Sequence, residues 1–212
     1  MENKYVIVLL GPQGSGKGTQ GKKLAEKLGI PYLETGQLLR DAIASGSEQG
    51  KYISSVIDKG NLLSSEFMNK FMGEKITASL TDKGVVLDGF PRRIGQAEFL
   101  DRIAPPTHVV LVDISEAESV RRLSARRRCP IDGRIYNLLT APPQNNTLCD
   151  DCQTPLEHRV DDHPEAIKER LAQYHKDTEP VIKYYEDKGV LHRLDGMPDI
   201  PEVEKEVWKI FS

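Results

Sequence analysis

A glycine-rich segment that ends in lysine, GPQGSGKGT at residues 11–19, has the composition of a phosphate-binding loop. It follows the apolar run Tyr5–Leu10 and leads into a helical pattern that begins at Lys17. Glycines let backbone N–H groups turn toward phosphate oxygens, and the N-terminal end of a helix attracts anions. The spacing departs from the general G-x-x-x-x-G-K-[ST] pattern because Gly18 stands at the hydroxyl position and Thr19 comes one residue later. The segment predicts a nucleoside triphosphate site, with Lys17 on the terminal phosphates, rather than a glycine-rich turn without a ligand.

A second polar segment, VVLDGFPRRIGQ at residues 85–96, also follows an apolar run. Asp88 ends that run, where its carboxylate could hold a water molecule of Mg²⁺ near the phosphates. Arg92 can bind a phosphate in a bidentate manner, and the amide of Gln96 could contact the edge of a base. Taken alone, the segment could equally be a surface turn. The turn itself is built by Gly89, Phe90 and Pro91.

All three cysteines lie in one short region, in the arrangement C-x2-D…C-x2-C. Cys129 and Asp132 form one half, Cys149 and Cys152 form the other, and sixteen residues separate the halves. This is the spacing of a structural zinc site in which one carboxylate replaces a thiolate. Free thiols, or a disulfide that uses two of the three cysteines, are the alternatives. Other candidates for the fourth ligand are His158, His163, Asp150 and Asp151.

Short apolar runs that alternate with helical patterns must position these residues. Near-continuous apolar runs are typical of parallel strands covered on both faces, so the pattern predicts a doubly wound α/β sheet. The expected strands are Tyr5–Leu10, Pro31–Leu33, Gly84–Leu87, His108–Val112 and Val190–Leu194. The expected helices are Lys17–Leu28, Thr35–Ser45, Ser64–Leu80, Glu116–Arg127, Pro164–Asp187 and Pro201–Phe211.

Composition limits the class of protein. The 212 residues are 38% hydrophobic and 29% charged, as expected of a globular protein with an ordinary core. The formal net charge of −3 argues against a general nucleic-acid or membrane-surface binder. An odd, clustered set of three cysteines does not suggest a secreted disulfide framework, so we expect a cytoplasmic protein.

Two segments interrupt the alternation of strands and helices. Between Thr35 and Leu80 we expect helix after helix, without a strong strand. Between Cys129 and Asp162 the chain is rich in loop-forming residues and contains all the cysteines. A structureless loop of that length is unusual in a compact domain, so this segment is expected to be a small lobe held together by a cross-link of its own.

Together, the two phosphate motifs resemble those of the adenylate kinase family of nucleoside monophosphate kinases. The pattern D-G-F-P-R-x-x-x-[NQ] is matched in full at residues 88–96. The resemblance continues through ETGQLLR (34–40), GNLLSSE (60–66), RLSARR (122–127), GRIY (133–136), RVDD (159–162) and ERLAQYH (169–175). It implies a P-loop core with a five-stranded parallel sheet at residues 1–34, 82–128 and 163–212. It also implies a monophosphate-binding lobe at 35–81 and a lid at 129–162.

The implied reaction is ATP + AMP ⇌ 2 ADP, dependent on Mg²⁺, with ATP, AMP and ADP as partners and a monomeric enzyme. Implied ATP contacts are Gly14, Ser15, Gly16, Lys17, Gly18, Thr19, Arg122, Arg126, Ile135, Tyr136 and Pro198. Implied AMP contacts are Thr35, Arg40, Asn61, Leu62, Leu63, Gly89, Phe90, Pro91, Arg92, Gln96, Arg159 and Arg170. The implied catalytic set is Lys17, Asp88, Arg92, Arg126, Arg159 and Arg170.

Several residues need separate comment. Arg122 and Arg126 stand four residues apart, so a helix would place them on one face. Many bacterial members of the family carry a lid metal site with four cysteines or with Asp in the last position, whereas here the Asp is second. Gln37 replaces an acidic residue near the family's metal, which bears on Mg²⁺ affinity.

Three other functions remain open on the sequence alone. A UMP/CMP kinase is disfavoured by the long 129–162 insert, because enzymes with pyrimidine preference usually have a short lid. A GTP-using kinase remains possible, since the triphosphate base is held largely by backbone atoms. A catalytically silent nucleotide- or metal-sensing protein would be expected to lack Lys17 or a lid arginine, and all are present.

Overall fold

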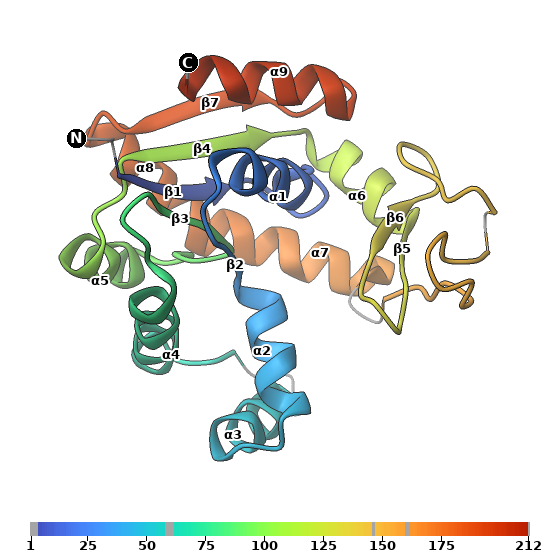
Figure 1. Cartoon of the computed structure of the whole chain (residues 1–212), viewed down its shortest axis with the longest axis horizontal. Helices are drawn as coiled ribbons and strands as arrows, with labels where there is room; N and C mark the ends of the chain where they lie inside the picture. Colours follow the sequence, from blue (N-terminus) through green and yellow to red (C-terminus); the bar gives the residue numbers. More distant parts are fainter. Residues whose placement is uncertain (1–3, 58–61, 146, 160–161, 212) are drawn as a thin grey trace.

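A five-stranded parallel sheet forms the centre of the molecule (Figure 1). The computed structural model describes residues 4–57, 62–145, 147–159 and 162–211. The strand order is β2-β3-β1-β4-β7, and every pairing is parallel. The five strands are β1 (Tyr5–Leu10), β2 (Tyr32–Glu34), β3 (Gly84–Asp88), β4 (His108–Asp113) and β7 (Leu191–Asp195). The predicted fold class is confirmed.

Successive side chains of each strand lie on opposite faces of the sheet and belong to two separate hydrophobic cores. On β1, Val6, Val8 and Leu10 belong to one core, and Ile7 and Leu9 belong to the other. Successive side chains of a strand point to opposite faces, so a strand buried on both faces must be apolar throughout. This is why the run YVIVLL carries no polar residue.

Helices cover both faces. α1 (Lys17–Leu28) and α9 (Ile200–Phe211) pack on the face that holds Ile7 and Leu9, whereas α4 (Ser65–Ser79), α5 (Ile94–Ile103) and α8 (Glu179–Asp187) pack on the other. The Ser64 hydroxyl caps α4 by accepting a hydrogen bond from the Phe67 amide at 3.1 Å. The α5 helix was not among the expected helices.

A pair of helices, α2 (Thr35–Ala44) and α3 (Glu48–Ile57), projects from the sheet below β2 (Figure 1). The two helices approach so closely that a Cβ atom on Gly50 would lie 1.9 Å from the Ala42 carbonyl oxygen. Glycine at this position therefore fixes their packing. The pair lies within the segment where successive helices without a strong strand were expected, although α3 itself was not assigned bounds.

A small antiparallel pair, β5 (Arg126–Arg128) and β6 (Ile135–Asn137), begins the lobe at the far end of α6 (Glu116–Ser124). The expected helix Glu116–Arg127 is therefore too long. The chain leaves the helix after Ser124 because residues 126–128 pair with β6, and Arg128 also exchanges two backbone hydrogen bonds of 2.9 Å with Glu157. Arg122 and Arg126 consequently do not share a helical face, which corrects that prediction.

The expected continuous helix 164–187 is also interrupted. It consists of α7 (Pro164–Gln173), a π-helical turn η2 (Tyr174–Thr178), and α8. The change of hydrogen-bond register leaves Pro180 in the first turn of α8, where its missing N–H breaks no helical hydrogen bond.

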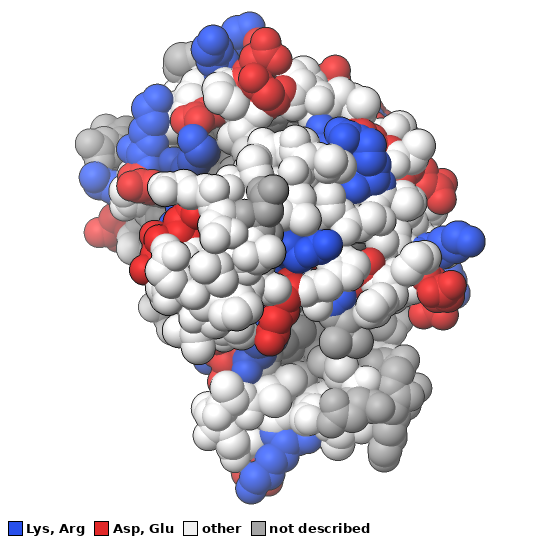
Figure 2. Space-filling model, turned by 90° about the vertical axis from the view of Figure 1, so that its right-hand side faces the viewer, with Lys and Arg blue, Asp and Glu red and all other residues white. Residues whose placement is uncertain are grey.

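The helices and the surface charge can be compared with what membrane-spanning proteins and nucleic-acid binders require. In the described part of the chain, no helix is long and apolar enough to cross a membrane. On the face seen in Figure 2, basic and acidic side chains lie interspersed rather than in one large basic patch. This face therefore offers no extended phosphate-backbone footprint of the kind that nucleic-acid binders use.

Candidate functional site

The glycine-rich loop joins the carboxyl end of β1 to the first turn of α1, as predicted. Gly14 and Gly16 have φ angles of 84° and 88°, in the left-handed region that favours glycine. The Lys17 ammonium donates a hydrogen bond to the Pro12 carbonyl at 3.2 Å, so the lysine folds back over the loop. The Ser15 hydroxyl is buried and has no hydrogen-bond partner among the described residues. The loop thus has the backbone form and the unpaired polar group of an anion site.

Positive charges from four parts of the chain converge on this loop. The pKa of Lys17 is lowered from 10.5 to about 8; burial is the largest cause, the nearby Arg92, Arg126 and Arg170 also lower it, and Asp88 opposes them. Such a concentration of positive charge is unfavourable in an empty site and favourable when polyphosphate enters.

The Asp88 carboxylate lies at the carboxyl end of β3, facing the start of α1. It is 7% exposed, and it accepts a hydrogen bond of 2.7 Å from the Tyr32 hydroxyl. Burial and the adjacent carboxylate raise the pKa of Tyr32, so the phenol stays a donor. A Cβ atom on Gly18 would lie 3.2 Å from Asp88 Oδ2 and 3.4 Å from Tyr32 Oη. The glycine at the usual hydroxyl position therefore leaves space for Asp88 and Tyr32, and Tyr32 was missed by the sequence analysis.

Thr35 and the turn at Gly89 form a second site beside Asp88. Thr35 is 3% exposed, and its hydroxyl has no hydrogen-bond partner in the described ranges. Gly89 has φ 83°, and a Cβ atom there would lie 3.4 Å from that of Thr35. Arg92 Nε donates to the Gly89 carbonyl at 2.9 Å, and the Arg92 amide donates to Gln96 Oε1 at 2.7 Å. The DGFPR segment is therefore packed beside Thr35 rather than being a surface turn, and its Phe90 and Pro91 are buried.

Arg40 reaches the same region from α2. Its guanidinium donates to Gln37 Oε1 at 2.8 Å and to Glu34 Oε1 at 3.2 Å. The pKa of Arg40 is lowered first by burial and, in part, by the positive charges of Arg159 and Arg128. Gln37, which stands where the family has an acidic residue near its metal, orients Arg40 in this structure.

Asp162 holds two of the predicted arginines in the lid-to-core region. Its side chain is fully buried and accepts from Arg126 Nε at 2.7 Å, Arg126 Nη2 at 2.5 Å and Arg170 Nη1 at 3.1 Å. The side-chain amide of Gln13 donates a hydrogen bond to the Arg170 backbone carbonyl at 3.2 Å, which connects α7 to the glycine-rich loop. The importance of Asp162 was missed, because only its place in the quoted RVDD segment pointed to it.

Arg122 lies further along, at the side of α6. Its guanidinium donates to Glu118 Oε1 at 2.6 Å and to the Met197 carbonyl at 3.1 Å, next in the chain to Pro198. Glu118 is a further residue missed by the sequence analysis; its pKa is lowered to about 2, chiefly by hydrogen bonds from Arg121 and Arg122.

The remaining predicted substrate contacts are differently exposed. Ile135 is 45% exposed, whereas Tyr136 is buried inside the lid and only 4% exposed. Leu62 is 61% exposed and Leu63 is buried. Asn61 lies outside the described residues.

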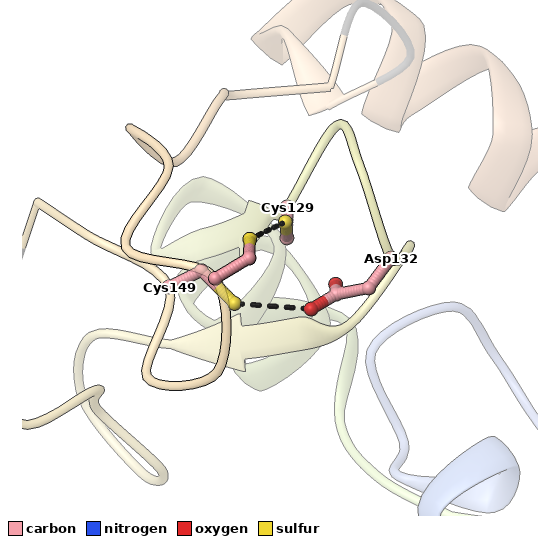
Figure 3. Close-up of side chains that lie close together, drawn as sticks. Cys129, Asp132 and Cys149 are labelled. Atoms are coloured by element: carbon pink, nitrogen blue, oxygen red, sulfur yellow. Dashed lines mark hydrogen bonds between the residues drawn. The ribbon is translucent and has the colours of Figure 1, made fainter.

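The four predicted metal ligands come together in the lid. One potential ligand atom from each of Cys129, Asp132, Cys149 and Cys152 lies within 4.8 Å of the others. Figure 3 shows the side chains of Cys129, Asp132 and Cys149 pointing toward one another. Cys149 Sγ is 3.2 Å from Asp132 Oδ2, and Cys129 Sγ is 3.4 Å from Cys152 Sγ.

Two similar turns present these ligands. In the first turn the Gly133 amide donates to the Cys129 carbonyl at 3.1 Å, and in the second the Gln153 amide donates to the Cys149 carbonyl at 3.0 Å. The residue after each pair is left-handed, with φ 74° at Gly133 and 55° at Gln153. Three sulfurs and a carboxylate on two such turns are a donor set that could hold zinc.

The competing ligands are engaged elsewhere. Asp150 Oδ1 accepts from the Gln144 amide at 2.8 Å, and Asp151 pairs with Arg134. The rings of His158 and His163 pack against each other, with centroids 5.4 Å apart. No disulfide joins the three cysteines in the structure. The geometry therefore favours Asp132 as the fourth ligand.

Comparison with known proteins agrees with the family resemblance seen in the sequence. The family model described as adenylate kinase matches residues 9–190. The adenylate kinase of Kosmotoga olearia is 44% identical over 208 residues, covering 96% of this chain and 97% of the relative. Those of Thermotoga neapolitana and Archaeoglobus fulgidus are each 42% identical, over 212 and 211 residues, and cover at least 96% of both chains. This chain belongs to the adenylate kinase family.

Proposed function

We propose that this protein transfers the terminal phosphoryl group of ATP reversibly to AMP, giving two molecules of ADP. The observation that carries the proposal is the convergence of Lys17, Arg92, Arg126 and Arg170 beside the glycine-rich loop. Phosphoryl transfer requires little covalent chemistry from a protein, so positioning and positive charge must supply most of the reduction in barrier. These four side chains provide both.

The two nucleotides would occupy opposite sides of Asp88. The loop 14–19 would hold the ATP phosphates, and Thr35, Arg40 and Arg92 would hold the AMP phosphate. The buried unpaired hydroxyls of Ser15 and Thr35 support these two positions, because buried polar groups normally find a hydrogen-bond partner. Arg159 and Arg170 would bridge the two phosphates.

Asp88 fits a role in holding Mg²⁺ through water. Its carboxylate is buried, accepts one hydrogen bond from Tyr32, and lies close enough to Lys17 to raise that residue's pKa. Mg²⁺ usually keeps several of its waters and binds one or two carboxylates together with substrate phosphates. When bound, it would neutralise charge on the phosphates. Asp88 would orient the hydrated ion, and Tyr32 would fix the Asp88 carboxylate.

The orientation of Gln96 supports selection of adenine. Because Oε1 accepts from the Arg92 amide, the NH₂ group of Gln96 is the part left for a base. Adenine presents an acceptor at N1, whereas guanine presents an N–H there and uracil presents an N–H at N3. A donor at this position thus favours AMP over GMP and UMP.

The three parts of the chain would have separate roles. We assign residues 1–34, 82–128 and 163–212 to the core, 35–81 to the monophosphate lobe and 129–162 to the lid. Closing of the lobe and the lid over the substrates would exclude water, since an open site would hydrolyse ATP. Metal in the lid would be structural, because its four positions are filled by protein ligands.

The enzyme is expected to act as a monomer in the cytoplasm. Both sets of nucleotide-binding residues lie in one chain, so no second copy is needed to complete the site. The three cysteines form no disulfide in the structure, which is compatible with a reducing compartment.

The test is a chromatographic assay of nucleotides in a mixture of ATP, AMP and Mg²⁺. The proposal predicts that ATP and AMP disappear in equal amounts and that two ADP form for each AMP consumed. ATP alone should remain intact over the same period, and EDTA should stop the reaction. Consumption of ATP without AMP would indicate a hydrolase and refute the proposal.

A further inference from the structure

We propose that the hydroxyl group of Tyr136 is a positioning group for the lid metal. Its oxygen lies 3.4 Å from Cys149 Sγ and accepts a hydrogen bond of 2.9 Å from the Asp150 amide. Because the oxygen already accepts from Asp150, its own proton is available to donate to the sulfur. The inference rests on the metal site proposed above and not on the enzymatic reaction.

The direction of this hydrogen bond suits a metal-bound sulfur. Cysteine binds metals as the thiolate, which carries no hydrogen and can only accept. A donor beside a ligand atom orients that atom, and partners of this kind typically change metal affinity by about 10–100-fold when removed. Tyr136 Oη is such a donor for Cys149.

Packing alone does not explain a tyrosine at this position. The side chain is 4% exposed and forms a small apolar cluster with Cys129 and Cys149. Phenylalanine would fill the same space without a hydroxyl group. Burying a hydroxyl costs free energy unless the group is hydrogen-bonded. The hydroxyl is tolerated because it is paired on both sides, with the Asp150 amide and with Cys149.

The same residue connects the second metal-binding turn to the strand pair that carries Arg126. Tyr136 lies at the centre of β6, directly opposite Arg127 of β5, and its neighbour Asn137 lies opposite Arg126. The first turn is joined to β5 through the chain itself, since Cys129 follows Arg128. The phenol therefore adds a side-chain link from the turn at 149–153 to the same strands. Metal binding would in this way fix the base from which Arg126 projects.

The test uses the full-length protein and the variant Tyr136→Phe, with Tyr52→Phe as a matched control. Tyr52 is 46% exposed on α3, and its ring packs against Phe67, so this control also loses only a hydroxyl group. Zinc affinity is measured by equilibrium competition with a chromophoric chelator. We expect Tyr136→Phe to bind zinc about 10–100-fold more weakly, whereas Tyr52→Phe should match the wild type.

Cobalt substitution gives a second readout that does not depend on affinity. At saturating Co²⁺, loss of a hydrogen bond to a thiolate should move the sulfur-to-cobalt charge-transfer band to lower energy in Tyr136→Phe. Affinity within twofold of the wild type together with an unchanged band would overturn the inference. Failure of the wild-type protein to bind either metal would instead refute the metal site itself, and the inference with it.

Discussion

The buried carboxylate of Asp162 offers the sharpest test of how the arginines are held. It is fully buried and accepts three hydrogen bonds, at 2.5–3.1 Å, from Arg126 and Arg170. Replacement by alanine removes the shared partner of two guanidinium groups. Breaking a buried ion pair by removing one partner typically costs about 3–5 kcal/mol. The arginine side chains are 17% and 29% exposed, so water can solvate them in part. We therefore expect the lower end, about 3 kcal/mol.

For a chain of this length, each kcal/mol lowers the melting temperature by roughly 2–4 °C. The Asp162→Ala variant should therefore melt about 6–12 °C below the wild type. The melting temperature of Asp162→Asn should lie between those of Asp162→Ala and the wild type, because asparagine keeps the shape of the side chain and one acceptor oxygen but loses the charge.

The measurement is thermal unfolding by calorimetry, without nucleotide and at saturating metal for every variant. Asp187→Ala is the matched control, because Asp187 pairs with Lys183 at 2.5 Å but is 62% exposed. An exposed helical pair of this kind contributes about 0.3–0.5 kcal/mol, so the control should lose less than about 2 °C. If Asp162→Ala melts no lower than Asp187→Ala, the carboxylate does not hold the arginines as described.

Four further predictions concern the site and the lid. Because the pKa of Lys17 is about 8, kcat/KM for ATP should fall as the pH rises above 8, and a flat profile from pH 7 to 10 would be contrary to the account. The unfolded chain keeps the Lys17 proton up to about pH 10.5, so the contribution of Lys17 to the free energy of unfolding should rise between about pH 8 and 10.5. Arg126→Lys keeps the charge but loses the planar fork, so kcat should fall roughly 10³-fold in steady-state assays, and an unchanged kcat would remove this arginine from the catalytic set. Gln96→Glu keeps the acceptor for the Arg92 amide but loses the donor for adenine N1, so KM for AMP should rise about 10-fold or more while KM for ATP stays the same; an equal rise in both would contradict the assigned base contact. Cys149→Ser should reduce bound zinc and the melting temperature of the lid more than kcat at 25 °C, as followed by metal analysis and calorimetry, and an equal loss of stability and rate would argue against a purely structural metal.

Much of the core could be predicted from the sequence because it is locally determined. The bounds of β1 and α1 were predicted to the residue, since an apolar run, a glycine loop and a lysine mark them without ambiguity. The four candidate metal ligands that the structure brings together were likewise predicted from spacing, because each half of the cluster is a short turn whose form depends on few residues.

Other features depend on contacts between distant segments. Residues 126–128 are strand rather than helix because they pair with β6 and with Glu157, and nothing in RRLSARRR indicates those partners. Asp162 is one of many acidic residues until the fold brings Arg126, 36 positions earlier, against it. Tyr32 gains its role only through Asp88 on the neighbouring strand β3.

The missed helix α5 is a different case. Its apolar residues Ile94, Ala97, Leu100 and Ile103 recur every three positions, which is a helical spacing. The signal was therefore present in the sequence, although the first residues of the helix, Ile94 to Gln96, also belong to the D-G-F-P-R-x-x-x-[NQ] pattern.

The most direct measurement follows the adenine ring of AMP through the reaction. AMP labelled with ¹⁵N in its base is mixed with unlabelled ATP and Mg²⁺, and the ADP formed is examined by mass spectrometry. The account predicts equal amounts of heavy and light ADP in the initial products, because each transfer converts one labelled AMP and one unlabelled ATP. Light ADP with inorganic phosphate and intact heavy AMP would show transfer to water, and would contradict the claim that this site joins two nucleotides.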